Sequence, residues 1–316
     1  MDALPVYNSR RRFLKQAGTL AAFSAMSGFP AATLAGEDQV KLTILHTNDV
    51  HSRIDPFPMD GSRYQGLGGI ARRASLINRI RTEERHVLLL DAGDTVQGTP
   101  YFNLFGGRLE MELMNKLGYD ASTFGNHEFD NGLEDLASMV SLARFPFLTS
   151  NYDFRNTPLA GKTRDYLILK RGGLRIGVFG LGIELDGLVD PTNCRDVQYL
   201  DPIGTANTWA DRLRHDYGCH FVICLSHLGY SYPSGQVSDR ILAAQTRNID
   251  LIIGGHTHTF MPAPEQIRNL AARLTTVNQV GFAGIQLGRL DYVFDRRTGK
   301  TTLAAAGRYE TSEQLA

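Results

Sequence analysis

This sequence of 316 residues contains only three cysteines, no excess of either charge and, after its first 36 residues, no long apolar run. Lys+Arg and Asp+Glu each total 33, so no basic surplus indicates nucleic-acid binding. Cys194, Cys219 and Cys224 show no CxxC spacing, which excludes a zinc ribbon or thioredoxin-like motif. A membrane-spanning helix needs about 20 apolar residues, so we expect no stable span in the mature chain.

The first 36 residues differ in composition from the rest. Residues 9–15, with the sequence SRRRFLK, precede an uncharged and weakly apolar run from Ala17 to Ala35 that ends in small residues. This pattern resembles a twin-arginine export signal. A membrane anchor or a basic tail is the alternative, but Gly18, Ser24 and Pro30 would make a poor spanning helix. We therefore expect residues 1–36 to direct export to the periplasm or otherwise out of the cytoplasm.

Apolar runs of strand length alternate with amphipathic stretches from residue 41 onward, which predicts an α/β fold. Strands are expected at 41–46, 87–90, 121–124, 147–149, 166–169, 175–179, 221–225, 251–253, 274–278 and 286–294. Helices are expected at 70–83, 109–116, 133–143, 205–215 and 239–245. The last two strands have no clear helix between them, which favours two sheets over one doubly wound sheet. With no linker or composition shift, residues 37–316 are expected to form one domain.

Five apolar runs each end in a short polar loop that contains side chains able to bind a metal ion. These loops hold Asp49-Val50-His51, Asp91-Ala92-Gly93-Asp94, Gly125-Asn126-His127-Glu128, Ser226-His227 and Gly254-Gly255-His256-Thr257-His258. Ligands gather at the carboxyl ends of strands in open α/β sheets, so these loops are expected to converge. Carboxylate, imidazole and amide donors without thiolates suit Mn, Fe, Zn or similar divalent ions.

These motifs, in this order and spacing, resemble those of the calcineurin-like metallophosphoesterases. The strings at 46–51 (HTNDVH), 93–100 (GDTVQGTP) and 125–132 (GNHEFDNG) are more narrowly similar to the bacterial 5′-nucleotidase branch. The resemblance spans about residues 41–296. It implies a four-layer α/β/β/α fold with two central mixed sheets flanked by helices, in which residues 37–316 are the catalytic domain.

The resemblance also implies a centre of two divalent metal ions. One ion would be bound by Asp49, His51 and His258, the other by Asn126, His227 and His256, and Asp94 would bridge them. A hydroxide shared by the ions would then attack the phosphorus atom of a phosphate ester in line with the leaving group. The nucleotidase branch often has Gln where this chain has His258, which could alter the metal preference of that ion.

His127 is the expected catalytic residue that protonates or stabilises the leaving oxygen, with Asp130 orienting its ring. Asp130 could instead cap the helix expected from residue 133, and Glu128 could be an ordinary loop carboxylate. His86 and His215 are expected at the surface, and His46 and His220 in or beside strands. Loop aromatics near the ligand motifs either stack on a nucleobase or serve packing; these are Phe57, Tyr101, Tyr230, Tyr232 and Phe260.

Bacterial 5′-nucleotidases that this chain resembles have a C-terminal domain that holds the nucleoside. Residues 297–316 are too few to form it, so we expect small, nucleotide-like phosphomonoesters as substrates, with weak selectivity unless a separate polypeptide supplies that domain. Thiosulfohydrolase-like or cyclic-nucleotide phosphodiesterase activity at the same site is the alternative. A non-catalytic metal-binding module is disfavoured, since His127 accompanies a full ligand set.

The export signal predicts the effect of one double substitution. Replacing Arg10 and Arg11 with Lys should retain the precursor in the cytoplasm, because twin-arginine signals are recognised by a receptor and not by charge alone. Cell fractionation and immunoblotting measure the outcome. Undiminished export of the double Lys protein would show that residues 17–35 act as an ordinary signal core.

Overall fold

The computed structural model describes residues 38–312 and contains two large β-sheets packed face to face. The expected export signal therefore lies outside the described residues. A four-stranded sheet has the order β12-β11-β1-β2 and a six-stranded sheet the order β4-β5-β7-β8-β10-β9. The first consists of β1 (Gln39–Thr47), β2 (Val87–Asp91), β11 (Gln286–Asp295) and β12 (Thr301–Glu310). The second consists of β4 (Tyr166–Arg171), β5 (Leu174–Leu181), β7 (Phe221–Ser226), β8 (Leu251–Gly254), β9 (Glu265–Arg268) and β10 (Leu274–Asn278).

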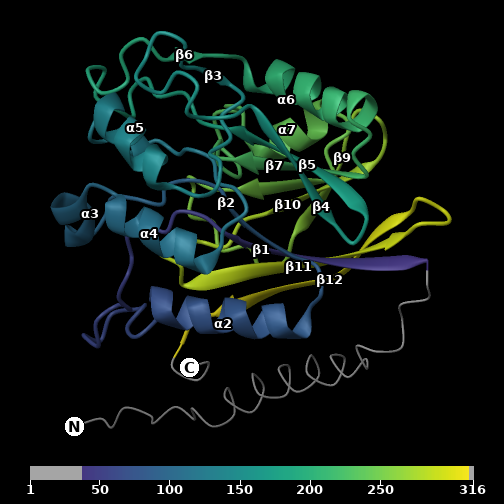
Figure 1. Ribbon diagram of the computed structural model, residues 1–316, viewed down its shortest axis with the longest axis horizontal. Helices are drawn as coiled ribbons and strands as arrows, with labels where there is room; N and C mark the ends of the chain where they lie inside the picture. Colours follow the sequence, from purple (N-terminus) through teal and green to yellow (C-terminus); the bar gives the residue numbers. More distant parts are fainter. Residues whose placement is uncertain (1–37, 313–316) are drawn as a thin grey trace, which may run out of the picture.

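Helices cover the outer face of each sheet, which completes four layers (Figure 1). On the four-stranded side lie α2 (Ile70–Glu83), α4 (Arg108–Leu117) and α5 (Leu133–Leu142), with the short α3 (Pro100–Phe105) leading into α4. On the six-stranded side lie α6 (Pro202–Asp211), which continues into a π-helical turn at Arg212–Asp216, and α7 (Asp239–Gln245). A small ribbon pairs β3 (Tyr152–Asp153) with β6 (Gln198–Tyr199). The α/β/β/α architecture with two mixed sheets is thus confirmed.

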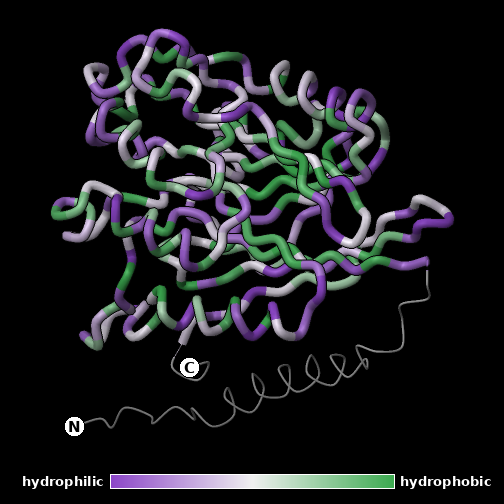
Figure 2. The backbone as a smooth tube through the Cα atoms, in the orientation of Figure 1, coloured by the Kyte–Doolittle hydropathy of each residue, from purple (hydrophilic) through white to green (hydrophobic). Residues whose placement is uncertain are grey.

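The apolar residues of the strands form a core between the sheets. In β7, Phe221, Ile223 and Leu225 face the other sheet, whereas Val222 and Cys224 face the helices α6 and α7. The alternation follows from the two-residue period of a strand, and both faces are apolar because both are covered. Figure 2 shows that hydrophobic residues are concentrated in the middle of the molecule. Cys219 and Cys224 are free and buried in the layer beneath the helices, while Cys194 is partly exposed.

Parallel pairing brings four strand ends to one side of the sheets. β1 pairs in parallel with β2, and β7 pairs in parallel with β5 and β8, so these strands run the same way within each sheet. The late strands β10 and β11 lie in different sheets, and β11 pairs antiparallel with β1, so these two strands follow one another without a helix between them. The loops after β1, β2, β7 and β8 are those expected to hold metal ligands.

The structure corrects several expected elements. Residues 121–124 and 147–149 form only isolated bridges, Leu90 to Ala121 and Ser122 to Phe147, which extend the sheet edge without becoming strands. The helix expected from residue 205 begins at Pro202, because Asp201 accepts hydrogen bonds from the backbone N–H groups of Ile203 and Gly204. The α3, β3, β6, β9 and β12 segments had not been expected as regular structure.

The strand β12 changes the expectation for the end of the chain. Its Ala-rich and Gly-containing sequence has low strand propensity, yet it pairs with β11 over nine residue positions. Pairing with an existing strand therefore outweighs local preference. Among residues 38–312, no helix is both long and apolar enough to cross a membrane.

Candidate metal centre

The structure brings the seven expected ligands into two adjoining groups. Side-chain atoms of Asp49, His51 and His258 lie within 4.8 Å of one another, as do those of Asp94, His227 and His256. Asn126 joins the second group, because its Oδ1 lies 2.9 Å from His256 Nδ1. The loops after β1, β2, β7 and β8 supply all of these residues except Asn126, which follows the bridged segment 121–124.

Asp94 lies where the two groups meet. Its Oδ2 is 3.0 Å from His227 Nε2 and 4.0 Å from His51 Nε2. A carboxylate has two oxygen atoms and several lone pairs, so one such group can serve two cations at once. The position of Asp94 is the one that the resemblance implies for a bridging ligand.

The arrangement of nitrogen atoms fits cations held by these groups. His51 Nε2 faces His258 Nε2 at 2.9 Å, which leaves two ring nitrogens directed at one point. His227 Nε2 is buried and makes no well-aligned hydrogen bond, although Asp94 Oδ2 lies 3.0 Å away. Buried polar atoms normally have a partner. A divalent ion with carboxylate, imidazole and amide ligands would supply one.

Other groups fix the orientation of these side chains. His227 Nδ1 lies 2.7 Å from the carbonyl oxygen of Ala92, and an N–H donated there leaves Nε2 as the lone-pair nitrogen that faces the site. Asp49 Oδ2 accepts a hydrogen bond of 2.6 Å from Asn48 Nδ2, and Oδ1 accepts one of 2.9 Å from the backbone N–H of His256. His227 and Asp49 are therefore oriented by contacts within the protein.

The charges in the site are strongly coupled. Burial alone would raise the pKa of Asp94, but the neighbouring His227 lowers it overall. Burial alone would lower the pKa of His227, but Asp94 and then Asp49 raise it overall. Burial, together with the charge of His227, lowers the pKa of His256 to about 4, so its ring is neutral and its lone pair available at pH 7.

The backbone of the ligand loops is unusual. Asp49, His51, Asp94, His256 and His258 all have φ between 51° and 70°, in the left-handed region that residues with a Cβ atom rarely adopt. This conformation costs about 1–2 kcal/mol per residue and is found at functional sites that the surrounding structure holds in place. Five such residues in one site are a second sign, independent of residue type, that these loops are functional.

Glycines create the space that the ligands occupy. A Cβ atom on Gly125 would collide with Asp94 Oδ1 and lie 2.5 Å from His227 Nε2. Gly93 has φ +90°, and a Cβ there would lie 2.6 Å from the backbone nitrogen of Gly125. Any side chain at either position would push the ligands apart. Gly93 and Gly125 therefore have a steric role.

Glu128 has a larger role than the sequence suggested. It is buried, and it accepts hydrogen bonds from the backbone N–H groups of Gly125, Asp94 and Thr95 at 2.6, 3.0 and 2.8 Å and from the Thr95 hydroxyl at 2.8 Å. Bonds from N–H to a carboxylate are about twice as strong as bonds between neutral groups. Glu128 thus locks the loop of Asp94 to the loop of Asn126.

Two further residues, Asp91 and Gln279, support the site although the sequence did not predict this role for them. Asp91 accepts hydrogen bonds from Thr47 and Ser122 and holds three chain segments together below the site. Gln279, after β10, donates to the carbonyl oxygen of Gly255 and accepts from the N–H of Thr259, which fixes the turn containing His256 and His258. Asp91 could have been found by its place in a ligand motif. Gln279 is 21 residues beyond the nearest ligand and carries no such signal.

His127 and Asp130 form a pair at the edge of the metal centre. His127 Nδ1 lies 2.8 Å from Asp130 Oδ2, and the backbone N–H of His127 donates to Asp94 Oδ1 at 2.9 Å. The hydrogen bond with Asp130 raises the pKa of His127 above its ordinary value. The side chain of Asp130 does not cap α5, which has Gly132 at its N-cap and no side-chain cap. The structure therefore favours the orienting role for Asp130 over the capping role.

The histidines and loop aromatics outside the ligand groups are buried, exposed or engaged in other contacts. His46 is buried and contacts Asn278, whereas His215 and His220 are exposed. Tyr101, Tyr230 and Tyr232 use their hydroxyl groups locally, donating to Asp55, Glu265 and the carbonyl oxygen of Leu228. Phe57 and Phe260 instead contact further aromatic rings close to His258.

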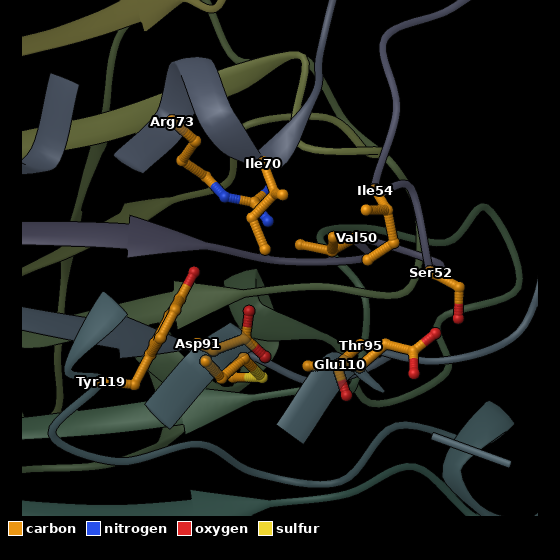
Figure 3. Close-up of a pocket in the computed structure, with 10 residues that line it drawn as sticks. Val50, Ser52, Ile54, Ile70, Arg73, Asp91, Thr95, Glu110 and Tyr119 are labelled. Atoms are coloured by element: carbon orange, nitrogen blue, oxygen red, sulfur yellow. The ribbon is translucent and has the colours of Figure 1, made fainter. Parts of the chain in front are cut away.

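A small cavity lies behind the ligand loops (Figure 3). It is lined by residues from these loops, including Ser52 and Thr95, and by Arg73 of α2 and Glu110 of α4. Its volume of about 20 Å³ is the size of a single water molecule. A phosphate ester is far too large for it, so the substrate must meet the metal ligands from the solvent side.

The fold and the paired ligand groups together define a metal-dependent phosphoesterase domain, and the comparisons agree. Residues 42–260 match the model of the calcineurin-like phosphoesterase family. Snake venom 5′-nucleotidase from Crotalus adamanteus is 35% identical over 288 residues, which cover 84% of this chain and 47% of that protein. The chain belongs to the calcineurin-like phosphoesterase family, and its resemblance to the 5′-nucleotidase branch is confirmed.

Solved structures show the same relationship. A 5′-nucleotidase precursor from Thermus thermophilus has a TM-score of 0.78 and 32% identity, covering 88% of this chain and 56% of its own. The calcineurin-like phosphoesterase YfkN from Bacillus subtilis has a TM-score of 0.72 and 25% identity, covering 88% of this chain and 93% of its own. The chain spans about half the length of the curated 5′-nucleotidases it matches.

The role of Glu128 predicts the effect of replacing it. Glu128→Gln should weaken the binding of Mn²⁺ by roughly 10- to 100-fold, because an amide removes the charge and turns an NH₂ group toward backbone N–H donors. Calorimetric titration with Mn²⁺ measures the affinity. Glu83→Gln, at an exposed position at the end of α2, is the matched control. Equal affinities in the two variants would show that the loops keep their shape without the Glu128 carboxylate.

Proposed function

We propose that this chain hydrolyses phosphate monoesters, nucleotide-like ones among them, with two divalent metal ions. The observation that carries the proposal is the meeting of two ligand groups at Asp94, with the His127–Asp130 pair beside them. Asp49, His51 and His258 would hold one ion, Asn126, His227 and His256 the other, and Asp94 both. The donor set suits Mn, Zn or Fe.

Bound divalent ions would act as Lewis acids on the phosphoryl oxygens and make water more acidic. The reaction breaks the bond between phosphorus and the ester oxygen and forms one between phosphorus and the oxygen of water. The ester oxygen leaves with a proton. The chain's own residues must therefore hold the phosphate in the orientation that the reaction needs and deliver that proton.

His127 is suited to deliver the proton. Its Nδ1 is engaged by Asp130, so Nε2 is the nitrogen that can face a substrate, and the raised pKa favours the protonated ring. The side chain is about one-third exposed, which leaves it accessible to a leaving group. The link from the His127 N–H to Asp94 Oδ1 fixes the distance between this acid and the metal ligands.

The names of the relatives support a nucleotide as the substrate. The proteins from Crotalus adamanteus and Thermus thermophilus, at 35% and 32% identity, are both named as 5′-nucleotidases. The thiosulfohydrolase and cyclic-nucleotide alternatives are accordingly not favoured. The export pattern in residues 1–36 supports activity outside the cytoplasm.

The two-ion proposal predicts strict metal dependence. Chelation should abolish phosphatase activity, and Mn²⁺ should restore it. Asp94→Asn should be the most damaging change of any single ligand, because a shared carboxylate serves both ions. Hydrolysis of an aryl phosphate and metal content per chain are the measurements. Asp216→Asn, whose side chain is 66% exposed, is the control. Full activity of Asp94→Asn, or of demetallated protein, contradicts the proposal.

The role of His127 predicts a change in chemistry without a change in metal content. His127→Ala should lower kcat by about 10²- to 10⁴-fold, the usual contribution of a general acid. Asp130→Asn should act in the same direction but less strongly, since the ring remains. Steady-state kinetics and metal analysis check both, with the exposed His215→Ala as control. Loss of a metal ion from His127→Ala would mean that His127 is a ligand.

A further inference from the structure

Helices α2 and α4 each carry one charged side chain on a buried face that is otherwise apolar. The buried residues of α2 are Arg73, Leu76, Ile77 and Ile80, and those of α4 are Glu110, Met111, Met114 and Leu117. Arg73 is 2% exposed and Glu110 is 4% exposed. Arginine and glutamate are almost never fully buried unless they are paired. The two charges at these positions therefore need partners.

Both side chains line the small cavity behind the ligand loops (Figure 3). They do not pair directly. Within residues 38–312, Nε and Nη1 of Arg73 and both carboxylate oxygens of Glu110 are buried without a hydrogen-bond partner. A buried charge without a partner is costly, because the protein interior does not replace the hydration that the charge has lost. The two charges have opposite signs, so one molecule between them could serve both.

The position of Arg73 is made possible by a glycine. Arg73 lies in the first turn of α2, where the partial positive charge of the helix N-terminus disfavours a cation. A Cβ atom on Gly284 would collide with Arg73 Nη1, so glycine leaves room for the guanidinium there. The preceding residue, Ala283, donates its N–H to the carbonyl oxygen of Asp49 at 2.6 Å. Arg73 therefore packs against the segment that holds the Asp49 loop.

Two ligand loops meet at the wall of the same cavity. Ser52 directly follows His51, Thr95 directly follows Asp94, and Ser52 and Thr95 both line the cavity. The N–H of Ser52 donates to the carbonyl oxygen of Thr95 at 2.9 Å, and the N–H of His51 donates to that of Asp94 at 3.0 Å. In the described part of the chain, the Ser52 hydroxyl is buried without a partner. A molecule in the cavity would thus adjoin both helices and both ligand loops.

The volume and the charges of the cavity fit one water molecule. The volume is about 20 Å³, and a buried water typically makes about three hydrogen bonds. Water can accept a hydrogen bond from Arg73 and donate one to Glu110, and the Ser52 hydroxyl offers a third partner. A cation would be repelled by Arg73. An anion would be repelled by Glu110 and by Asp91, which also lines the cavity.

We propose that one water molecule bound in this cavity links Arg73 to Glu110, and that these two are positioning residues for the metal centre. The link would hold α2 and α4 to the loops of His51 and Asp94. Both residues would act through the backbone of these loops and not by contact with an ion. This inference rests on the proposed metal centre and adds two residues that no ligand motif contains.

A series of charge-removing variants separates a positioning role from a purely structural one. The variants are Arg73→Met, Glu110→Met, the combination of both, and Arg73→Lys, which keeps the charge. The control is Arg214→Met, which breaks a partly buried ion pair with Asp250 at the end of β8 that is remote from the ligands. Calorimetric titration measures the affinity for Mn²⁺, and scanning calorimetry without Mn²⁺ measures Tm.

Each single Met variant leaves one buried charge unpaired, so its Tm should fall by roughly 5–15 °C. Its affinity for Mn²⁺ should fall by roughly 10- to 100-fold, as for other residues that support ligands. The combined variant removes both charges and should regain a Tm within roughly 3 °C of wild type. Its affinity for Mn²⁺ should stay about 10-fold weaker, because the link to the loops is lost.

Two further variants complete the comparison. Arg73→Lys should bind Mn²⁺ more tightly than Arg73→Met, because the ammonium group can still donate to the water. Arg214→Met should lose stability and keep the wild-type affinity for Mn²⁺. Equal losses of Mn²⁺ affinity in Arg214→Met and Arg73→Met would show that lower stability alone weakens the site, and would overturn the positioning role.

A high-resolution crystal structure of the wild-type protein tests the water directly. Density for one water within hydrogen-bonding distance of Arg73 and Glu110 is expected, and it should be absent from the combined variant. Direct contact between the two side chains, or no ordered molecule in the cavity, overturns the water link.

Binding of Mn²⁺ by the wild-type protein separates this inference from the proposed function. If the wild-type protein binds no Mn²⁺, the two-ion proposal itself fails, and the positioning role fails with it. If it binds Mn²⁺ but the combined variant regains both Tm and affinity, Arg73 and Glu110 serve only stability. Wild-type affinity in the single Met variants would likewise overturn the inference while leaving the proposed function intact.

Discussion

The candidate site depends on backbone that its ligands adopt against their own preference. Asp49, His51, Asp94, His256 and His258 are all held in the left-handed region. Isolated loops with these residues would relax to ordinary conformations and scatter the side chains. The hydrogen bonds from loop backbone to Glu128, and those made by Gln279, offset this tendency. The supporting residues are therefore as necessary to the site as the ligands.

The candidate site lies at the junction of the two sheets. Asp49, His51 and Asp94 follow strands of the four-stranded sheet, whereas His227, His256 and His258 follow strands of the six-stranded sheet. The core that separates the sheets, including Phe221, Ile44 and Leu290, thereby sets the spacing between the two sets of ligands. Close-packed interiors resist changes in volume. The apolar core of this protein thus holds the two sets of ligands of the metal centre at a fixed distance.

The ligand loops and several helices could be predicted from the sequence. The features that could not be predicted are those that depend on contacts between distant parts of the chain. The ligand loops were identifiable because Asp, His and Asn recur after apolar runs beside glycine, and the helices 70–83 and 239–245 were predicted with the observed bounds. Residues 121–124 were expected to form a strand because they lead into a ligand loop as the true strands do, but they make only isolated bridges. The strand β12 was hidden because pairing with β11 decides its conformation, and local sequence does not. Gln279 acts through tertiary contacts that no motif marks.

The position of Asp94 has a thermodynamic consequence. A single carboxylate that belongs to both ligand groups couples their occupancy, so that two ions held there could not bind independently. By reciprocity, the factor by which one ion changes the affinity for the second equals the factor by which the second changes the affinity for the first. The population of the half-loaded protein is then governed by this linkage and not by the intrinsic affinity of either group alone.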